Sequence, residues 1–471
     1  VFLMLAQIVA SYVLVWLMDS FRQKRMGRIF YILSVLLPFA ALFYFKYFYF
    51  FAGTIFHLDV KAVPLPIGIS FYTFQIVSYC VDVYDRKVKR QKNFITYAAY
   101  VTLFPQLVAG PIVRYSDIDQ TLIKGTGFSD MHVNFERGAV RFAVGLGKKV
   151  LVANVLGEFV AEVAALGQRN LVLSWAYAAA VSLQIYFDFS GYSDMAIGLG
   201  SILGFSFPEN FRYPFIAKSV SEFWRRWHMT LGAWFRDYVY IPMGGNRVSM
   251  SRWIWNILVV WLFTGLWHGA GWNYLVWGAM HGVLYVVTRF WQRMIGGRGA
   301  PQKQCGRRDS KEENAGNDNS VINNVVERTS LRCRIRVSIM TLLSQILLFA
   351  YVSIAWVYFR AQDIAQANSL LAAAIKGNLQ KISLDLAECF RLDEFWYVIK
   401  ILHLDNMAYS RYILMAGILA AGLYLSMAGP NAAQRMERSR FRAGSVFVLA
   451  VLMVWSILSF SGVSTFLYFN F

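Results

Sequence analysis

The sequence holds six histidines, and the most informative of them is His268. His268 ends a long apolar run, and an ionisable side chain in or beside hydrocarbon is by default a functional hypothesis. The glycines beside it, Gly265 and Gly269, allow either a thin substrate or another backbone to approach closely. The alternative is a small-residue packing seam in which the histidine fills a gap. These residues alone favour neither interpretation.

A second candidate, His228, closes the motif Phe223-Trp-Arg-Arg-Trp-His. If this segment is one helix, Trp224 and Arg225 share a face with His228, because they lie four and three residues before it. Together with Arg226, such a face can hold a phosphate-bearing ligand by arginine pairing and stacking. The alternative, which these residues alone favour, is an interfacial helix whose arginines reach lipid headgroups.

The remaining histidines are expected to be structural. His281 lies thirteen residues beyond His268, and on one helix the two side chains would point well apart. No two-histidine metal site follows, and packing is the expected role of His281. The other three lie in probable loops or interfacial segments without a polar cluster around them; they are His57, His132 and His403. The four cysteines show neither disulfide nor metal-ligand spacing.

A polar cluster interrupts an otherwise apolar stretch, and its members are Asp188, Ser190, Tyr192 and Asp194. Two carboxylates in apolar surroundings need partners or protons. They can orient a histidine or the arginines of this region as supporting residues. Structural pairing with Arg212 or Lys218 is the favoured alternative.

The elements that position these residues are membrane spans. Hydrophobic residues make up 57% of the 471 positions and charged residues 15%, against about 25% charged in globular proteins. The run 29–52, with Lys46 as its single charge, is as long as a bilayer span of about 20 residues. Apolar segments are expected at 1–18, 29–52, 66–84, 94–113, 139–165, 171–205, 252–268, 272–290, 337–359, 411–428 and 445–461. The segment 171–205 is long enough for two short spans, and the whole predicts an all-α polytopic membrane protein.

The net charge of +19 sits mostly in short loops between these segments. This distribution is typical of cytoplasmic loops and argues against a nucleic-acid partner. The basic loops are 19–28, 85–92, 292–336 and 430–442. Parity then predicts that 362–410 is an extracytoplasmic loop. Because the chain starts at Val1, either an alternative start codon has been read as Val or an upstream segment is missing.

Two segments depart from the pattern of plain spans. The segment 206–251 is aromatic and basic and holds prolines and paired glycines that break helices, so it predicts interfacial or re-entrant structure. Non-helical backbone at membrane depth needs a cavity or protein around it, and a cavity is therefore expected nearby. The stretch 297–330 has almost no large apolar residue and predicts a disordered loop within 292–336.

These motifs, in order, resemble the membrane-bound O-acyltransferase family across nearly the whole chain. The resemblance rests on Pro66 to Tyr72, Phe104 to Pro111, Tyr186 to Met195, Glu222 to His228, Arg236 to Arg247, Gly265 to Gly269, Trp277 to Gly282 and Phe359 to Ala361. It implies one domain of roughly eleven helices around a central funnel. It also implies that His268 matches the catalytic histidine and His228 the second active-site histidine. The same motifs add Trp267 and Asn246 to the supporting residues.

The family resemblance implies transfer of an acyl group from the cytoplasm to an acceptor outside. The leading hypothesis is acetyl transfer from acetyl-CoA, with no bound cofactor or metal, to an exported polysaccharide that is alginate-like or another cell-envelope polymer. An extracytoplasmic acetyltransferase is the expected partner, and the bacterial inner membrane the expected location. A neutral imidazole at His268 suffices as general base for a thioester, while His228 stabilises the oxyanion or steers the donor.

Two other functions stay open. D-alanyl transfer to teichoic acid is a near alternative, although the motifs of 236–247 look more like the acetyltransferase branch. A transporter or flippase of lipid-linked sugars would show paired intramembrane charges and matching broken helices, neither of which is evident from the sequence. If 206–251 faces the cytoplasm, the helix from Arg252 to His268 rises roughly 24 Å and places His268 deep in the membrane.

Overall fold

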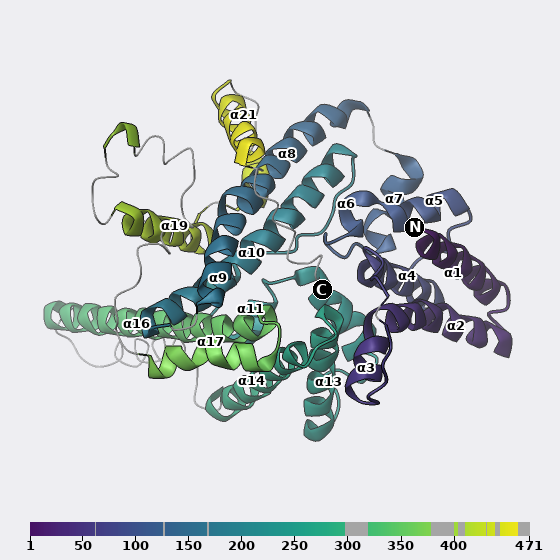
Figure 1. Ribbon diagram of the computed structural model, residues 1–471, viewed down its shortest axis with the longest axis horizontal. Helices are drawn as coiled ribbons and strands as arrows, with labels where there is room; N and C mark the ends of the chain where they lie inside the picture. Colours follow the sequence, from purple (N-terminus) through teal and green to yellow (C-terminus); the bar gives the residue numbers. More distant parts are fainter. Residues whose placement is uncertain are drawn as a thin grey trace.

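The computed structural model describes residues 1–61, 63–125, 128–166, 169–296, 319–377, 400–403, 410–429, 431–438 and 443–459. Within these ranges every regular element is a helix, and none is a strand. The sequence prediction of an all-α fold is therefore confirmed. Figure 1 shows the early helices gathered on one side of the molecule, with a pair of long helices crossing its centre.

The N-terminal half of the chain builds two groups of helices. The first comprises α1 (Phe2–Ser20), α2 (Arg25–Leu42), η1 (Phe43–Tyr47), α3 (Phe48–Thr54), α4 (Ile69–Tyr84), α5 (Phe94–Thr102), α6 (Phe104–Leu107) and α7 (Tyr115–Lys124). The second comprises α8 (Phe128–Gly147), η2 (Lys148–Asn154), α9 (Val155–Ala165) and α10 (Leu171–Ile202). The elements η1 and η2 are π-helical turns that continue the helices before them.

The second half of the chain carries short helices first and long ones later. The short elements are η3 (Pro214–Ile216), α11 (Val220–Trp224), α12 (Met229–Phe235) and η4 (Arg236–Tyr240). The longer ones are α13 (Met250–His268), α14 (Trp272–Gly296), α16 (Asn319–Arg360), α17 (Ile364–Lys376), α19 (Ser410–Met427), α20 (Ala432–Arg438) and α21 (Ala443–Leu458).

Four of the described helical runs are long and apolar enough to cross a bilayer. They are Phe2–Ser20, Arg25–Thr54, Leu171–Ile202 and Ser338–Arg360. Three of them leave most of their residues outside the protein core, and large apolar side chains such as Leu36 and Leu347 are exposed. An apolar surface of this extent is stable only against lipid. The protein is a multi-pass membrane protein, as the composition predicts.

The central element is α10, which packs against α8, η2, α9, α16 and α17. It is one continuous helix of 32 residues, so the suggestion of two short spans within 171–205 is wrong. The sequence of α10 holds no proline, so nothing removes a hydrogen bond from the interior of this helix. Figure 1 shows α8 and α10 side by side at the centre of the molecule.

Glycines let α8 and α10 approach backbone to backbone. A Cβ added to Gly145 would lie 2.6 Å from the carbonyl oxygen of Gly191, and one added to Gly191 would lie 2.8 Å from that of Gly145. Gly138 and Gly198 make the same reciprocal contact one heptad away. Such small-residue seams bring membrane helices together by close packing.

Two predicted segments differ in the structure. The segment 94–113 is not one span: α5 ends at Thr102, and the Leu103-Phe104-Pro105 step starts a new helix, because proline is accepted in the first helical turn only. Part of the expected disordered stretch 297–330 is helical, since α16 begins at Asn319; extending an existing helix requires no new nucleation. Residues 297–318, like Cys305 and Cys389, lie outside the described residues.

The segment 206–251 is irregular, as predicted. It holds four short elements, of which α12 continues directly into η4, and Tyr213 and His228 both have left-handed backbone conformations. The expected extracytoplasmic loop 362–410 opens with the amphipathic helix α17, which is capped by Asp363 and packs on α10 and α16. The part of that loop from 378 to 399 lies outside the described residues.

Candidate functional site

His228 lies at the turn between two short helices. Its backbone φ is 43° and its ψ is 54°, a left-handed conformation that is uncommon for a residue other than glycine. Helix α11 ends at Trp224, so Trp224, Arg225 and His228 do not share one helical face, and that part of the sequence interpretation is wrong. The break follows from backbone contacts of the preceding irregular segment, whose Asn210 carbonyl accepts the N–H of Met229 at 3.0 Å.

His268 is the last residue of α13, and only 4% of it is exposed. Its ring packs edge-on against Trp277 and Phe359, with centroids 5.1 Å and 5.0 Å away. Helix α13 runs without interruption from Met250 to His268. His268 therefore lies about 27 Å along the axis from the start of its helix.

Trp267 joins the two histidines. Its ring centroid is 4.9 Å from that of His268 and 6.0 Å from that of His228. The structure thus brings together three residues that the sequence places in two motifs about forty residues apart. A buried wall that includes Phe71, Phe74 and Trp267 surrounds this junction.

Lys46 also meets the end of α13, and the sequence analysis did not include it among the site residues. Its Nζ donates to the carbonyl oxygen of Trp267 at 2.5 Å and to Ser70 Oγ at 3.2 Å. No carboxylate of the described residues lies within ion-pair distance of it. The signal was present, because a lone lysine in a long apolar run marks a functional position.

A cavity of about 470 Å³ opens beside His228. Its wall includes Trp224, Arg225, His228, Arg236 and Thr264, together with apolar side chains of α12 and α13. Volumes of about 300 to 1,000 Å³ are typical of small-molecule sites. His268 is not part of the wall, but Thr264 lies one helical turn before it on α13.

The arginines of the region have different surroundings. Arg225 is exposed at the cavity and, in the described part of the chain, makes no ion pair. Arg226 instead binds Glu222 at 2.8 Å and does not reach the cavity wall. Burial alone would raise the pKa of Glu222, but the N–H of Lys218 and the Arg226 guanidinium outweigh it and hold that pKa below its ordinary value. Asn246 is exposed in the turn after η4, away from the cavity.

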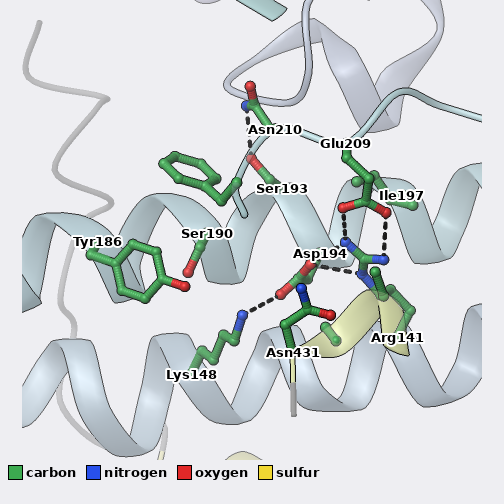
Figure 2. A pocket seen from close by; sticks show the side chains of 13 residues that line it. Arg141, Lys148, Tyr186, Ser190, Ser193, Asp194, Ile197, Glu209, Asn210 and Asn431 are labelled. Atoms are coloured by element: carbon green, nitrogen blue, oxygen red, sulfur yellow. Dashed lines mark hydrogen bonds and ion pairs between the residues drawn. The ribbon is translucent and has the colours of Figure 1, made fainter. Parts of the chain in front are cut away.

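The carboxylates of α10 bind cations of the adjacent helix, not Arg212 or Lys218. Asp194 pairs with Arg141 at 2.6 Å and with Lys148 at 2.6 Å, and Asp188 pairs with Lys149. The expected partners are wrong because the glycine seam sets α8 and η2 directly against α10. Figure 2 shows Asp194 held between Lys148 and Arg141.

This ion-pair cluster continues toward His228. Arg141 also binds Glu209 through both terminal nitrogens, at 2.8 Å and 2.7 Å. The next residue, Asn210, donates from its side chain to Ser193 Oγ at 3.1 Å (Figure 2). The Asn210 side chain in turn contacts His228 at 2.9 Å. The carboxylates thus reach a histidine through Glu209 and Asn210, which the sequence analysis missed because no local pattern marks them.

Two further polar residues of the predicted cluster have more local roles. Ser190 lies with Tyr186 beside a small pocket at the ion pairs, and Figure 2 shows both. Tyr192 is partly buried against the cluster of aromatic residues that contains Trp267. Neither belongs to the wall of the large cavity.

The glycines around His268 are used for helix packing. Gly265 of α13 lies so close to α14 that a Cβ on it would collide with the carbonyl oxygen of Tyr274. This supports the packing seam for Gly265. His281 is fully buried among indole rings, with Trp224 at 4.9 Å, as expected for a residue that packs. Within the described residues no group of three metal-ligating side chains occurs.

Comparison with known proteins identifies relatives of this chain. The chain is 45% identical over 240 residues to the probable alginate O-acetylase AlgI of Pseudomonas aeruginosa. The matched region covers 51% of this chain and 45% of that protein. It is 44% identical over 230 residues to the corresponding protein of Azotobacter vinelandii, 46% of whose length is matched. The chain thus spans about half the length of these relatives.

More distant relatives are matched over other extents. The peptidoglycan O-acetyltransferase of Helicobacter pylori is 29% identical over 408 residues, 79% of this chain and 69% of that protein. The teichoic acid D-alanyltransferase of Bacillus subtilis is 29% identical over 236 residues, 48% of this chain and 60% of that protein. The family model of membrane-bound O-acyltransferases matches residues 38–299, more than half of the chain and all of the site. The chain belongs to the membrane-bound O-acyltransferase family.

Proposed function

We propose that this protein transfers an acetyl group from cytoplasmic acetyl-CoA to hydroxyl groups of an exported polysaccharide at the bacterial inner membrane. An extracytoplasmic acetyltransferase or the polysaccharide itself is the proposed acceptor. The relatives named for O-acetylation of alginate and of peptidoglycan support a polysaccharide substrate. The proposal needs no resident cofactor, because a thioester is already activated.

The observation that carries the proposal is the cavity whose wall includes His228 and, one helical turn before His268, Thr264. Arg225 and Arg236 supply guanidinium groups to its wall, which suits the phosphates of a nucleotide-linked thioester. Leu231, Ile257 and Val260 supply an apolar wall for a thin acyl-carrying arm. His228 is the only titratable group of the described wall that is almost fully buried. A donor bound here would present its thioester beside His228 and one turn from His268.

The proposed chemistry is acyl transfer with general-base catalysis. The acceptor hydroxyl oxygen attacks the thioester carbonyl carbon, the carbon–sulfur bond breaks, and the hydroxyl proton passes through an imidazole to the departing sulfur. We assign the role of general base to His268, whose burial among aromatic rings disfavours a charged imidazolium. A base of this kind contributes about 10² to 10⁴-fold to the rate.

The positions of Lys46 and His268 support a site far from the cytoplasmic surface. Both lie near the ends of helices that start beside basic segments, after Arg25 and at Met250. At ~1.5 Å per residue, each rises roughly 27 to 32 Å along its helix. This depth suits a reaction between a cytoplasmic thioester and an acceptor on the other side.

The similarity to a teichoic acid D-alanyltransferase makes D-alanyl transfer the second candidate. We favour acetyl transfer because the alginate O-acetylases are 44 to 45% identical over the matched half, against 29% for that enzyme. The two functions differ in their donors. One uses acetyl-CoA, and the other uses an acyl group held on a carrier protein.

A membrane-vesicle assay separates these candidates. Inside-out vesicles that contain the full chain receive radiolabelled acetyl-CoA or D-alanyl carrier protein, and label in polysaccharide is counted. We expect label from acetyl-CoA, its loss in His268→Ala, and its retention in His132→Ala, whose side chain is exposed on α8. Label from the D-alanyl carrier alone, or label that persists in His268→Ala, would refute the proposal.

A further inference from the structure

Asn210 holds the turn that contains His228. The carbonyl oxygen of Asn210 accepts the N–H of Met229 at 3.0 Å, and the carbonyl of Arg226 accepts the N–H of Arg212 at 2.9 Å. The irregular segment 210–212 therefore lies along the two sides of the His228 turn. A left-handed conformation at a residue other than glycine persists only where its surroundings impose it. These contacts impose it on His228.

The orientation of the Asn210 amide follows from its other partners. The backbone N–H of Thr230 points at Asn210 Oδ1 at 3.4 Å, and Thr230 Oγ1 lies 3.0 Å from the same oxygen. The Nδ2 group donates to Ser193 Oγ at 3.1 Å. The opposite orientation would place the amide N–H₂ against a backbone N–H, two donors facing each other. Oδ1 is therefore the atom that faces His228.

This orientation determines the tautomer of His228. Asn210 Oδ1 lies 2.9 Å from His228 Nδ1, and an amide oxygen can only accept. Nδ1 thus carries the ring proton, and Nε2 of the neutral ring carries a lone pair. Nε2 is buried and has no hydrogen-bond partner among the described residues. A buried polar atom without a partner is costly, and at the wall of a cavity it points to a ligand.

We propose that Asn210 is a positioning residue that fixes His228 as a hydrogen-bond and proton acceptor toward a bound substrate. This inference rests on the proposed acyl transfer. It also changes the role expected for His228, because a neutral ring of this tautomer has no N–H to offer an oxyanion at Nε2. The indole N–H groups of Trp224 and Trp267, which have no acceptor among the described residues, can serve the oxyanion instead.

The ion-pair cluster of Arg141, Lys148 and Asp194 positions Asn210 through neighbouring residues. Glu209, the residue before Asn210, accepts hydrogen bonds from Arg141 of α8. Ser193 of α10, which accepts from the Asn210 amide, directly precedes Asp194, the other partner of Arg141. The central helix pair thus sets the position of Asn210 on both its backbone and its side chain. This gives the buried charges of α8 and α10 a role in placing His228.

The test compares Asn210→Ala with Asn210→Asp in the full chain, by release of the CoA thiol from acetyl-CoA across a range of pH. We expect Asn210→Ala to lower kcat about 10 to 100-fold with little change in the KM for acetyl-CoA, as for other residues that orient a catalytic histidine. Asn210→Asp should keep kcat within a few fold. Its carboxylate still accepts from Nδ1 and stabilises the imidazolium, so the acid limb of the kcat profile should move to higher pH.

A second measurement determines the tautomer of His228 directly, without reference to enzyme activity. Nitrogen NMR of histidine-labelled protein, with the His228 signals identified by their loss in His228→Gln, reports which ring nitrogen carries the proton. We expect Nδ1 in the wild type. Protonation at Nε2, or an Asn210→Asp variant as slow as Asn210→Ala with an unmoved acid limb, would overturn the inference. A wild type that releases no CoA would instead refute acetyl transfer from acetyl-CoA, the proposed function on which the inference rests.

Discussion

Among single residues, the two histidines differ in how the protein holds them. His228 is fixed by an amide at Nδ1, whereas His268 is enclosed by the rings of Trp267, Trp277 and Phe359. The His228 ring lines the cavity, whereas His268 is not part of the cavity wall. This division suits a reaction in which donor and acceptor arrive from different sides.

The indole of Trp224 provides the next prediction. It lines the cavity, and its N–H has no acceptor among the described residues. If this N–H stabilises the thioester oxyanion, Trp224→Phe should lower kcat about 10²-fold while the KM for acetyl-CoA changes little. The variant keeps an aromatic ring at the cavity wall but loses the hydrogen-bond donor. Steady-state kinetics measure both. Trp255→Phe, at an exposed site on α13, is the matched control, and an unchanged kcat in Trp224→Phe would exclude the indole.

Sequence reasoning found His228, His268 and Trp267 because ionisable and aromatic groups in apolar surroundings are conspicuous. It missed Asn210, since an asparagine in an irregular segment has no pattern that reveals its contacts. It also gave Asp188 and Asp194 the wrong partners. Their true partners depend on which helix packs against α10, and the glycine seam that decides this is formed by contacts distant in sequence.

Among the elements, Lys46 ties the first helices to the end of α13. Its ammonium satisfies the Trp267 carbonyl in the last turn, where helical carbonyls have no intrahelical partner. Lys46→Met should leave that carbonyl unsatisfied, at about 1 to 3 kcal/mol, and displace His268. We expect a lower melting temperature in detergent and slower acetyl transfer. Lys46→Gln, which keeps a donor, should recover most of the melting temperature; equal loss in both variants would contradict this contact.

The seam between α8 and α10 gives a prediction about packing. Gly191 contacts the backbone of Gly145 so closely that Gly191→Leu must separate the helices. Overpacking of this kind typically costs about 1 to 3 kcal/mol or more, and it would also move the ion pairs that support Asn210. A lower melting temperature and lower activity are expected. Gly417→Leu in α19, where a side chain meets open space, should change neither; similar loss at both sites would argue against a special seam.

For the molecule as a whole, hydropathy and charge predicted the class of fold well. The apolar segments correspond to helices, and the irregular segment 206–251 is where helices are short. The errors lie in continuity: α10 is not divided, and 94–113 is. Hydropathy measures how well a residue tolerates lipid, but it does not report where a helix breaks; α10 holds no proline, whereas 94–113 is divided at the step before Pro105.

The membrane sidedness is testable on the full chain. The basic loop 85–92 is expected in the cytoplasm, and α17 outside. In a variant without reactive native cysteines, Lys89→Cys should react with an impermeant maleimide only in inside-out vesicles. Ser369→Cys, exposed on α17, should react only in intact cells whose outer barrier is permeabilised. Labelling of both from one side would contradict the topology.

The most direct test of the account is the acetyl content of the exported polysaccharide, measured by mass spectrometry in cells that carry His268→Ala, His132→Ala or the wild-type chain at equal membrane levels. We predict that His268→Ala removes nearly all acetyl groups from the polysaccharide. His132→Ala should leave the acetyl content at the wild-type level. Wild-type acetylation in cells whose only copy carries His268→Ala would contradict the account.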